Sequence, residues 1–541
     1  MYGSGCSHTV RLFVVLFLTA PALSAAYSNL IATSDGSSVY FQVRTSPVAY
    51  SWYSATGQTV TPIAQPLADL DSSASITVSA QTLAKTCGFG GSSCFLADNC
   101  QATFAIAGPG IKYSNPNSTY TRLSRSGKFV WIDQHVCWNL TPPPAFNVTP
   151  LHGLYDTATL ALIAAQGTTR LATAQYGRRA VTDSGRALVL DGAQLAWLDA
   201  GGKQLIRNVN GAAEAITDPN GTVVVYQETG SGRLHWVSGP DWLGATDTDL
   251  GVAGSAPALT EDGGKLLFLA ADGSLQLYDH ASLGTRRFGA DFYQSFATGG
   301  GAVFAVTLDG RLMRLDLAGG AASVALPAFP EITVVGALDV QPNYCTYICY
   351  GDTDYGKAIS PGMLVTLDGK ALGDSGWHAR SAGADTVVYP LSNTTAWFQA
   401  PNELGAGGPL EPLEIYRDDF PIRWTMKVSV QDQQLVCLGT LHQDFSRVVS
   451  GADPASTGEV VHVFLTGLRG VEPVPDGVPN PVNHLIPVAN PPALSDPAAL
   501  EQLFFGLAPG LGGMQQLDVR VHGAVAGLFS APSLNCSVPV G

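Results

Sequence analysis

Residues 258–279 read ALTEDGGKLLFLAADGSLQLYD and contain one complete copy of a short repeat. A turn around Gly263 leads into an apolar run, and a second turn at Asp272-Gly273 leads into a run that alternates apolar and polar residues. Alternation is the period of a strand with one buried face. Asp-Gly between two such runs favours a tight hairpin, because glycine accepts positive φ. The stretch therefore predicts two strands joined by a tight turn.

The same pattern occurs four times between residues 179 and 316. The second turns fall at Gly192, Gly232, Gly273 and Gly310, in steps of 40, 41 and 37 residues. A period of this length made of short strands is typical of the blades of a β-propeller. Gly-rich β-sandwiches also form regularly spaced hairpins, but they seldom hold a fixed period through four units. We therefore expect an all-β protein built around a propeller.

Weaker copies extend the pattern on both sides. Openings recur around Gly36 and Gly127, 91 residues apart, which leaves room for two blades. After Gly310 the next comparable turn is Leu367-Asp368-Gly369, and a last strand-like unit covers 385–398. Counting openings and gaps allows seven or eight blades.

Two resemblances to known families add to this interpretation. The units resemble the WD40-like blades of the TolB type, in openings such as Thr182-Asp183-Ser184-Gly185 and in the Tyr278-Asp279 ending. The C-terminal part is similar to the Solibacter-type C-terminal domain of secreted acidobacterial proteins, which implies a small Ig-like β-sandwich. His522-Gly523 departs from the Pro-x-Gly of that family and leaves the last strand open. The segments that carry the second resemblance are 458–464 (GEVVHVF), 466–468 (TGL), 476–477 (DG), 505–513 and 516–521 (QLDVRV).

These observations divide the chain into four parts. Residues 1–26 read as a signal peptide, because Arg11 precedes a short apolar run and Ser24-Ala25-Ala26 supplies small residues for cleavage. Residues 27–400 are expected to form the propeller, 401–418 a Gly/Pro linker, and 419–541 the Ig-like sandwich. We expect a secreted, periplasmic or cell-surface protein without a membrane span, and a monomer.

Cysteine usage agrees with export. Cleavage of the signal would remove Cys6 and leave eight cysteines, an even number that suggests disulfides in an exported chain. Cys437 and Cys536 flank the C-terminal domain and are one expected pair, and Cys345 with Cys349 is the other. Three pairings stay open among the remaining residues Cys87, Cys94, Cys100 and Cys137.

Composition excludes some functions, and motif searches exclude others. The net charge is −15 and only 13% of residues are charged, so no basic stripe is present to bind nucleic acid. No zinc-peptidase helix, phosphate loop, dinucleotide fingerprint or nucleophile elbow occurs. Asp247-Thr248-Asp249 and Asp352-Thr353-Asp354 lack the spacing of a calcium loop and are interpreted as solvated loops. We expect no cofactor and no metal, and catalytic residues stay unassigned.

The segment 343–357 (NYCTYICYGDTDYGK) interrupts the repeat and carries the richest side-chain chemistry. Aromatic rings beside carboxylates suit sugar stacking or peptide contact, so Tyr347, Tyr350, Asp352 and Asp354 are the candidate ligand-binding residues. The alternative is that the tyrosines pack beneath a long loop. We expect a binding or scaffold protein for an extracellular glycan or protein. The alternative is a polysaccharide hydrolase or lyase, which would gather Asp, Glu or His at the channel mouth.

Overall fold

The computed structural model describes residues 27–541, except 47–49, 65–66, 72, 83–101, 109–110, 116–119, 134–151, 166–168, 174, 176–177, 210, 240–241, 243, 320, 338–358, 405–410, 429, 431–434, 526 and 531–535. Strands form every regular element in these ranges. No helix in them is long and apolar enough to cross a membrane. The expected all-β class is confirmed, and the many antiparallel sheets are consistent with a propeller-like fold.

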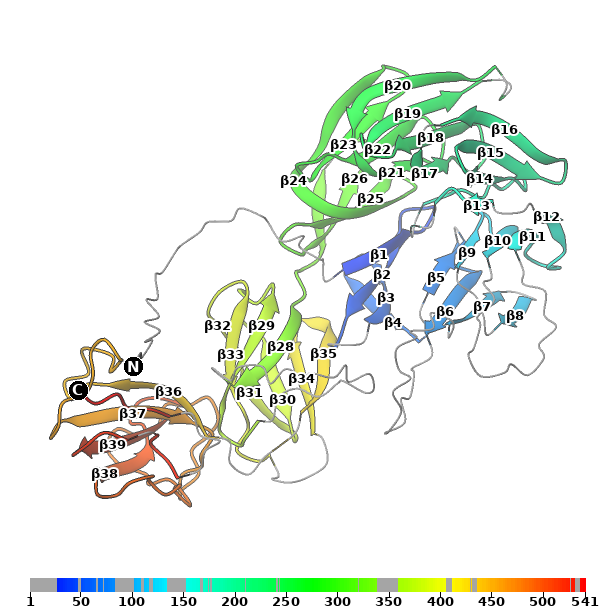
Figure 1. Cartoon of the computed structure of the whole chain (residues 1–541). Helices are drawn as coiled ribbons and strands as arrows, with labels where there is room; N and C mark the ends of the chain where they lie inside the picture. The colour runs from blue at the N-terminus through cyan, green and yellow to red at the C-terminus, as the bar shows by residue number, and fades with distance from the viewer. Residues whose placement is uncertain are drawn as a thin grey trace, which may run out of the picture.

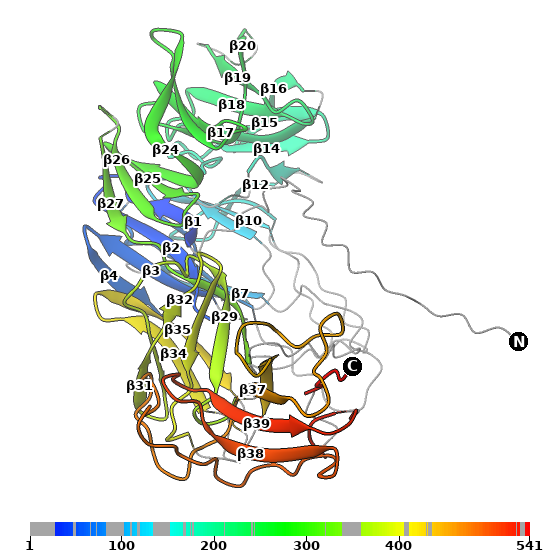
Figure 2. The same ribbon diagram turned by 90° about the vertical axis from the view of Figure 1, so that its left-hand side faces the viewer.

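Seven antiparallel units follow one another from Tyr27 to Leu326 (Figures 1 and 2). The first three pair in the orders β1-β2-β3-β4, β5-β6-β7-β8 and β9-β10-β11-β12. Their strands are β1 (Tyr27–Ala32), β2 (Ser38–Arg44), β3 (Tyr50–Thr56), β4 (Thr59–Ile63), β5 (Leu67–Leu70), β6 (Thr77–Thr82), β7 (Ala102–Gly108), β8 (Ile111–Asn115), β9 (Tyr120–Leu123), β10 (Phe129–Asp133), β11 (His152–Asp156) and β12 (Leu162–Ala164).

The next four units contain the plain repeats. The long strand β24 pairs with β23 through its first half and with β25 through its second, so it belongs to both of the last two units. The strands are β13 (Arg170–Leu171), β14 (Ala187–Asp191), β15 (Gln194–Asp199), β16 (Gly202–Asn208), β17 (Ala212–Thr217), β18 (Val223–Glu228), β19 (Arg233–Ser238), β20 (Thr246–Ala253), β21 (Ser255–Leu259), β22 (Lys265–Leu269), β23 (Ser274–Asp279), β24 (Gly284–Gly299), β25 (Ala302–Thr307), β26 (Leu312–Asp316) and β27 (Ala322–Leu326).

The hairpins predicted in these four units are confirmed. Gly192, Gly232, Gly273 and Gly310 have φ of 57, 69, 83 and 90°, the positive values that favour glycine. Each lies between two strands that pair directly with each other. The apolar runs before these turns become the second strand of each unit and are almost wholly buried, which explains their lack of alternation.

A side-chain hydrogen bond builds the opening turn of the repeat. Thr260 Oγ1 donates to Asp262 Oδ1 at 2.5 Å, and the same carboxylate oxygen accepts the N–H of Gly264 at 3.0 Å. Gly263 takes a φ of 66° between them. Such local bonds to the backbone favour a turn over a continued strand. The turn at 33–37 repeats this arrangement, so the sequence motif specifies the point where each first strand reverses.

The first strands of the units meet at the centre. β5 contacts β9, β17 contacts β21, β21 contacts β24, and β24 contacts β1, so the start of the chain lies beside the seventh unit. At this closure a Cβ on Gly299 would lie 1.9 Å from Thr33 O. Only glycine allows the two backbones to approach so closely.

The pairing pattern changes after Leu326. β29 pairs with β28 and β33, and β30 pairs with β31 and β34, so chain neighbours are divided between two sheets. Leu367-Asp368-Gly369, predicted as a turn, lies inside β29; that prediction is wrong, because all three residues pair with β28 or β33 as a strand. The strands are β28 (Glu331–Ala337), β29 (Leu364–Lys370), β30 (His378–Ser381), β31 (Ala384–Val387), β32 (Tyr389–Pro390), β33 (Thr395–Gln399), β34 (Glu411–Arg417) and β35 (Phe420–Val428).

A last sheet has the order β36-β37-β39-β38 and its own buried core. Figures 1 and 2 show the three groups of strands following one another, with β28–β35 between the seven units and the last sheet. One core continues from the first unit into the middle group, where Phe329 and Trp377 meet edge to face at 6.0 Å between ring centroids. The strands of the last sheet are β36 (Val436–Leu441), β37 (Val460–Thr466), β38 (Leu500–Leu507) and β39 (Gln515–Val521).

Candidate functional site

A small cavity lies where the first strands of several units converge. Its volume is about 30 Å³, close to the share of one water molecule in the liquid. Three arginines line it, Arg125, Arg178 and Arg179, together with Glu261 and Thr298. In a chain with only 13% charged residues, this is an unusual concentration of positive charge.

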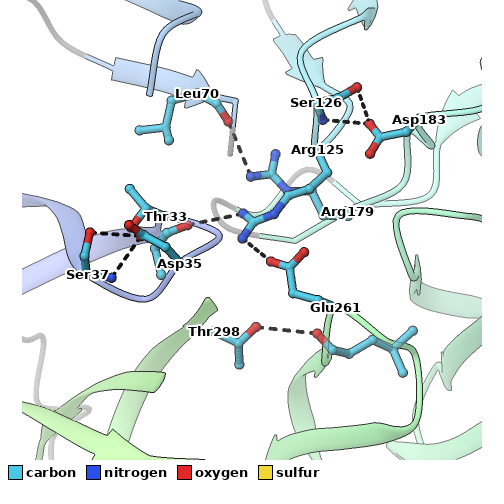
Figure 3. Close-up of polar contacts among 12 residues, drawn as sticks. Thr33, Asp35, Ser37, Leu70, Arg125, Ser126, Arg179, Asp183, Glu261 and Thr298 are labelled. Carbon is cyan, nitrogen blue, oxygen red and sulfur yellow. Dashed lines mark hydrogen bonds and ion pairs between the residues drawn. The ribbon is translucent and has the colours of Figure 1, made fainter. Parts of the chain in front are cut away.

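Arg125 connects three units across this centre. It follows β9 in the opening turn of the third unit, and its side chain is only 8% exposed. Its guanidinium donates to Ala32 O at 3.2 Å and forms an ion pair with Glu261 of the sixth unit (Figure 3). Burial lowers the pKa of Arg125, and the nearby charge of Arg179 lowers it further. Two guanidinium groups therefore lie in one low-dielectric region. Nearby carboxylates must offset the repulsion between their charges.

Arg179 is fixed by the buried carboxylate of Asp69. Its Nη1 lies 3.2 Å from Asp69 Oδ1. Its Nη2 donates to Leu70 O at 3.4 Å, a contact that Figure 3 shows. The Asp69 side chain is 1% exposed and also accepts the N–H of Leu123 at 2.8 Å. A buried ion pair contributes when further hydrogen bonds satisfy the remaining lone pairs. Asp69 is therefore a neutralising and positioning group, with its oxygens occupied.

Arg178 differs from the other two arginines, because no carboxylate of the described residues accepts a hydrogen bond from it. It is 4% exposed, its Nη2 donates to Ala256 O at 2.9 Å and Phe296 O at 3.3 Å, and its guanidinium lies over the Phe296 ring. Among the described residues, its Nε and Nη1 have no hydrogen-bond partner. Burial lowers the pKa of Arg178 to about 10, which leaves it charged at neutral pH. A buried donor without a partner costs roughly 1–3 kcal/mol, more when charged.

Glu214 is the carboxyl group whose charge acts on Arg178 and partly opposes the lowering of its pKa. No hydrogen bond joins the two, and Glu214 accepts its hydrogen bond from Thr173 Oγ1 at 2.5 Å instead. Burial raises the pKa of Glu214, although Thr173 and Arg178 oppose that shift. The cavity therefore combines two paired arginines with a third whose charge is incompletely matched.

No local sequence pattern predicted these arginines as a site. Asp69 and Arg179 are 110 residues apart, and Arg125 and Glu261 are 136 apart, so local patterns could not connect them. One signal was available: Arg178-Arg179 and Arg125 stand beside opening turns in a chain with few charges. An enzyme was expected to gather Asp, Glu or His at the channel mouth, and the three arginines do not fit that expectation.

The predicted ligand-binding residues Tyr347, Tyr350, Asp352 and Asp354 lie outside the described residues. The same holds for the signal peptide and for most of the cysteines, namely Cys87, Cys94, Cys100, Cys137, Cys345 and Cys349. Cys437 and Cys536 are described and form a disulfide with a Cα–Cα distance of 5.6 Å, the pair expected from the sequence.

Asp247-Thr248-Asp249 does not form the predicted loop, because these residues lie in β20. Asp247 pairs with Arg207 at 2.9 Å and with His235 Nδ1 at 3.1 Å, and Asp249 pairs with Arg233. Both carboxylates are thus paired with arginine side chains of the protein itself. Within the ranges that the structure describes, no group of three or more His, Cys, Asp or Glu could hold a metal ion.

Comparisons with known proteins give only distant neighbours. Neither a protein-family model nor a curated relative matches the sequence. Among solved structures, a Lactobacillus plantarum protein is 13% identical with a TM-score of 0.34, covering 53% of this chain and 94% of its own. A Mycobacterium tuberculosis puromycin-hydrolyzing peptidase is 14% identical with a TM-score of 0.34, covering 65% and 60%. The Cps50 (Swd1) β-propeller domain from Myceliophteria thermophila is 11% identical with a TM-score of 0.28, covering 58% and 90%. Similarity this low supports no functional inference.

Proposed function

We propose that the protein is an exported binding or scaffold protein whose propeller-like ring presents a ligand face at the cavity of Arg125, Arg178 and Arg179. The observation that supports this is the pairing of the carboxylates. Arg179 holds Asp69, and Arg125 holds Glu261. General acid–base catalysis needs a positioned group such as a carboxyl or a histidine to move a proton; the carboxylates named here are ion-paired with arginines, whereas two buried N–H donor groups of Arg178 lack a partner among the described residues. Such donors bind and orient a ligand.

We propose a carbohydrate or a protein as the ligand, and the segment 343–357 as a second contact through Tyr347, Tyr350, Asp352 and Asp354. The alternative, a polysaccharide hydrolase or lyase, requires free acids at the channel mouth. Among the described residues, the acid in the cavity lining, Glu261, is ion-paired with Arg125, and the nearby Asp69 is ion-paired with Arg179. These pairings favour binding over catalysis. A disulfide is compatible with export, because such bonds persist in oxidising compartments.

The proposed architecture follows from the sheet order. We infer that the seven units are seven blades ending at Leu326, that β28–β35 form a separate two-sheet sandwich, and that 436–541 form the Ig-like domain. The contact between β24 and β1 supports seven blades rather than eight, since it places the first unit against the seventh. Under this division the propeller is shorter than the sequence-based range 27–400.

A combined glycan and peptide array, probed with the secreted protein, tests the binding function. The expected result is retention of a specific set of ligands without any change in them. A parallel assay incubates the protein with polysaccharides and measures new reducing ends. Release of sugars, with no ligand retained on the array, would overturn the binding function in favour of the enzyme.

A further inference from the structure

The donors of Arg178 that lack partners need an acceptor that the protein does not supply. Arg178 lines the central cavity and is 4% exposed, yet its Nε and Nη1 have no hydrogen-bond partner among the described residues. Its Nη2 is anchored by two backbone carbonyls from the sixth and seventh units. The guanidinium is therefore held in place with part of its donor set unused, which is the condition of a prepared binding group.

The carboxylates around the cavity are distributed unevenly among the three arginines. Three arginines line it, and the carboxylates of Asp69 and Glu261 are bound to Arg179 and Arg125. The charge of Glu214 acts on Arg178, but Glu214 accepts its hydrogen bond from Thr173. Thr260 and Thr298 complete the polar lining. Arg178 is therefore the one of the three that no carboxylate of the described residues hydrogen-bonds, since its recorded acceptors are the backbone carbonyls of Ala256 and Phe296.

The size of the cavity limits the ligand. A volume of about 30 Å³ accommodates one small group of a ligand rather than a whole sugar ring or a whole side chain. A halide ion or a carboxylate head fits that volume. The unused Nη1 and Nε of Arg178 lie on different edges of the guanidinium, so each can donate separately to a halide or to one carboxylate oxygen.

We infer that the cavity binds one small monovalent anion on Arg178, either as a free ion or as the carboxylate of a larger ligand. This inference rests on the proposed binding function and specifies the chemical group that the site recognises. The anion bridges Arg178 to the polar lining and completes the centre where the first strands meet. Because the units contact one another at this point, occupancy of the site stabilises the ring.

Thermal unfolding of the full chain at constant ionic strength tests the inference. Sodium chloride or sodium acetate replaces the sodium salt of MOPS, a sulfonate too bulky for the cavity. Binding to the native state alone raises the melting temperature with anion concentration. We expect a rise that saturates with chloride and with acetate. A response to acetate alone identifies a carboxylate site, and a response to chloride alone a halide site. Equal melting temperatures in all three salts would overturn the inference.

Two variants locate the effect. Arg178→Met should abolish the response, and Arg178→Lys, which keeps the charge but loses the planar guanidinium donors, should weaken apparent affinity by roughly tenfold. Arg286→Met is the matched control, because Arg286 is exposed on β24 away from the cavity lining; it should respond as the wild type does. An unchanged response in a folded Arg178 variant would contradict the site.

A crystal grown in sodium bromide keeps the test independent of variant folding. We expect an anomalous bromide peak within hydrogen-bond distance of Arg178 Nη1 or of Arg178 Nε. A water molecule there, without an anomalous peak in bromide and without a carboxylate in acetate, would overturn the inference. Loss of anion binding with ligands still found on the array removes this inference alone. Anion binding with an empty array removes the proposed function alone.

Discussion

Arg125 and Glu261 form an ion pair across the centre of the ring, although 136 residues separate them in the sequence. Arg125 is nearly buried at 8% side-chain exposure, whereas Glu261 is 37% exposed. The pair joins the third unit to the sixth, which strand hydrogen bonds do not connect. The ion pair therefore connects these two units through their side chains.

Replacing Glu261 with Gln should destabilise the ring modestly. The change leaves the buried charge of Arg125 less compensated, but solvent screens a pair with one exposed member, so the expected loss is about 1 kcal/mol. Urea unfolding followed by tryptophan fluorescence measures it. Glu414→Gln is the control, because Glu414 pairs with the half-exposed Arg423 on the middle strands. That variant should change stability by no more than about 0.5 kcal/mol, and a larger loss there than at Glu261 would argue against a structural role for the central pair.

Gly299→Ala should disrupt the closure between the first and seventh units. The added methyl would lie 1.9 Å from Thr33 O, a backbone atom that cannot move aside easily. Overpacking of this kind costs about 1–3 kcal/mol. Gly301→Ala is the matched control two residues on, where a Cβ meets nothing within 4 Å. Calorimetry should show a lower melting temperature for the first variant only; equal temperatures for both would mean that the units do not close at this contact.

The fold could be predicted where local signals were repeated. The four plain units were found because each hairpin carries a glycine at positive φ. The second unit was missed as a separate opening because its turn places Ala74, with φ of 58°, where the other units have glycine. The segments of β28–β35 were assigned to the propeller because local sequence patterns do not reveal strand order, which depends on long-range pairing. β29 pairs with β33 rather than with its chain neighbour β30, and no local pattern records that choice.

The site was less predictable than the fold. Its arginines function through partners contributed by other units, as Arg179 does with Asp69. Sequence reasoning looked for chemistry where the loops are longest, and so favoured Tyr347 and its neighbours. The centre of a ring is assembled from one short segment of each unit, and no single segment looks functional alone. The disulfide was predictable because Cys437 and Cys536 flank the last domain.

Reduction of the Cys437–Cys536 disulfide should destabilise the last domain selectively. The bond closes a loop with a sequence separation of 99 residues, for which the chain-entropy relation gives about 4–5 kcal/mol. Because the core of this domain is a separate cluster, the ring should unfold as before. Calorimetry of the Cys437→Ser/Cys536→Ser double variant should show one transition lowered and the others unchanged. A uniform decrease would show that the domains unfold together.

Asp476 should make the contact between the middle strands and the last domain sensitive to pH. It accepts hydrogen bonds from Asn402 N at 3.1 Å and from Asn402 Nδ2 at 2.6 Å. Burial, followed by the charge of Glu403, raises its pKa from 3.8 to about 6. The native state then binds more protons than the unfolded state between these values, so stability falls as pH rises from about 4 to about 6.

Asp476→Asn should remove this dependence. The amide keeps an acceptor for Asn402 and carries no charge, so the variant should melt at a higher temperature than the wild type at pH 7 and at the same temperature near about pH 3. Glu403→Gln should reduce the difference, since Glu403 is the second cause of the shift. Melting temperatures across the pH range provide the measurement. A wild type more stable at pH 7 than Asp476→Asn would mean that the carboxylate is favourably placed.

Binding of the array ligands by wild type, Arg178→Lys and Arg286→Lys tests the central claim most directly, namely that the arginine cavity is the ligand face. Arg178 is buried at the cavity, whereas Arg286 is exposed elsewhere on the ring, so the two conservative changes differ in place and not in chemistry. We expect Arg286→Lys to bind these ligands as the wild type does and folded Arg178→Lys to bind them with roughly tenfold lower apparent affinity. Equal binding by all three proteins would contradict the claim and place the ligand face elsewhere.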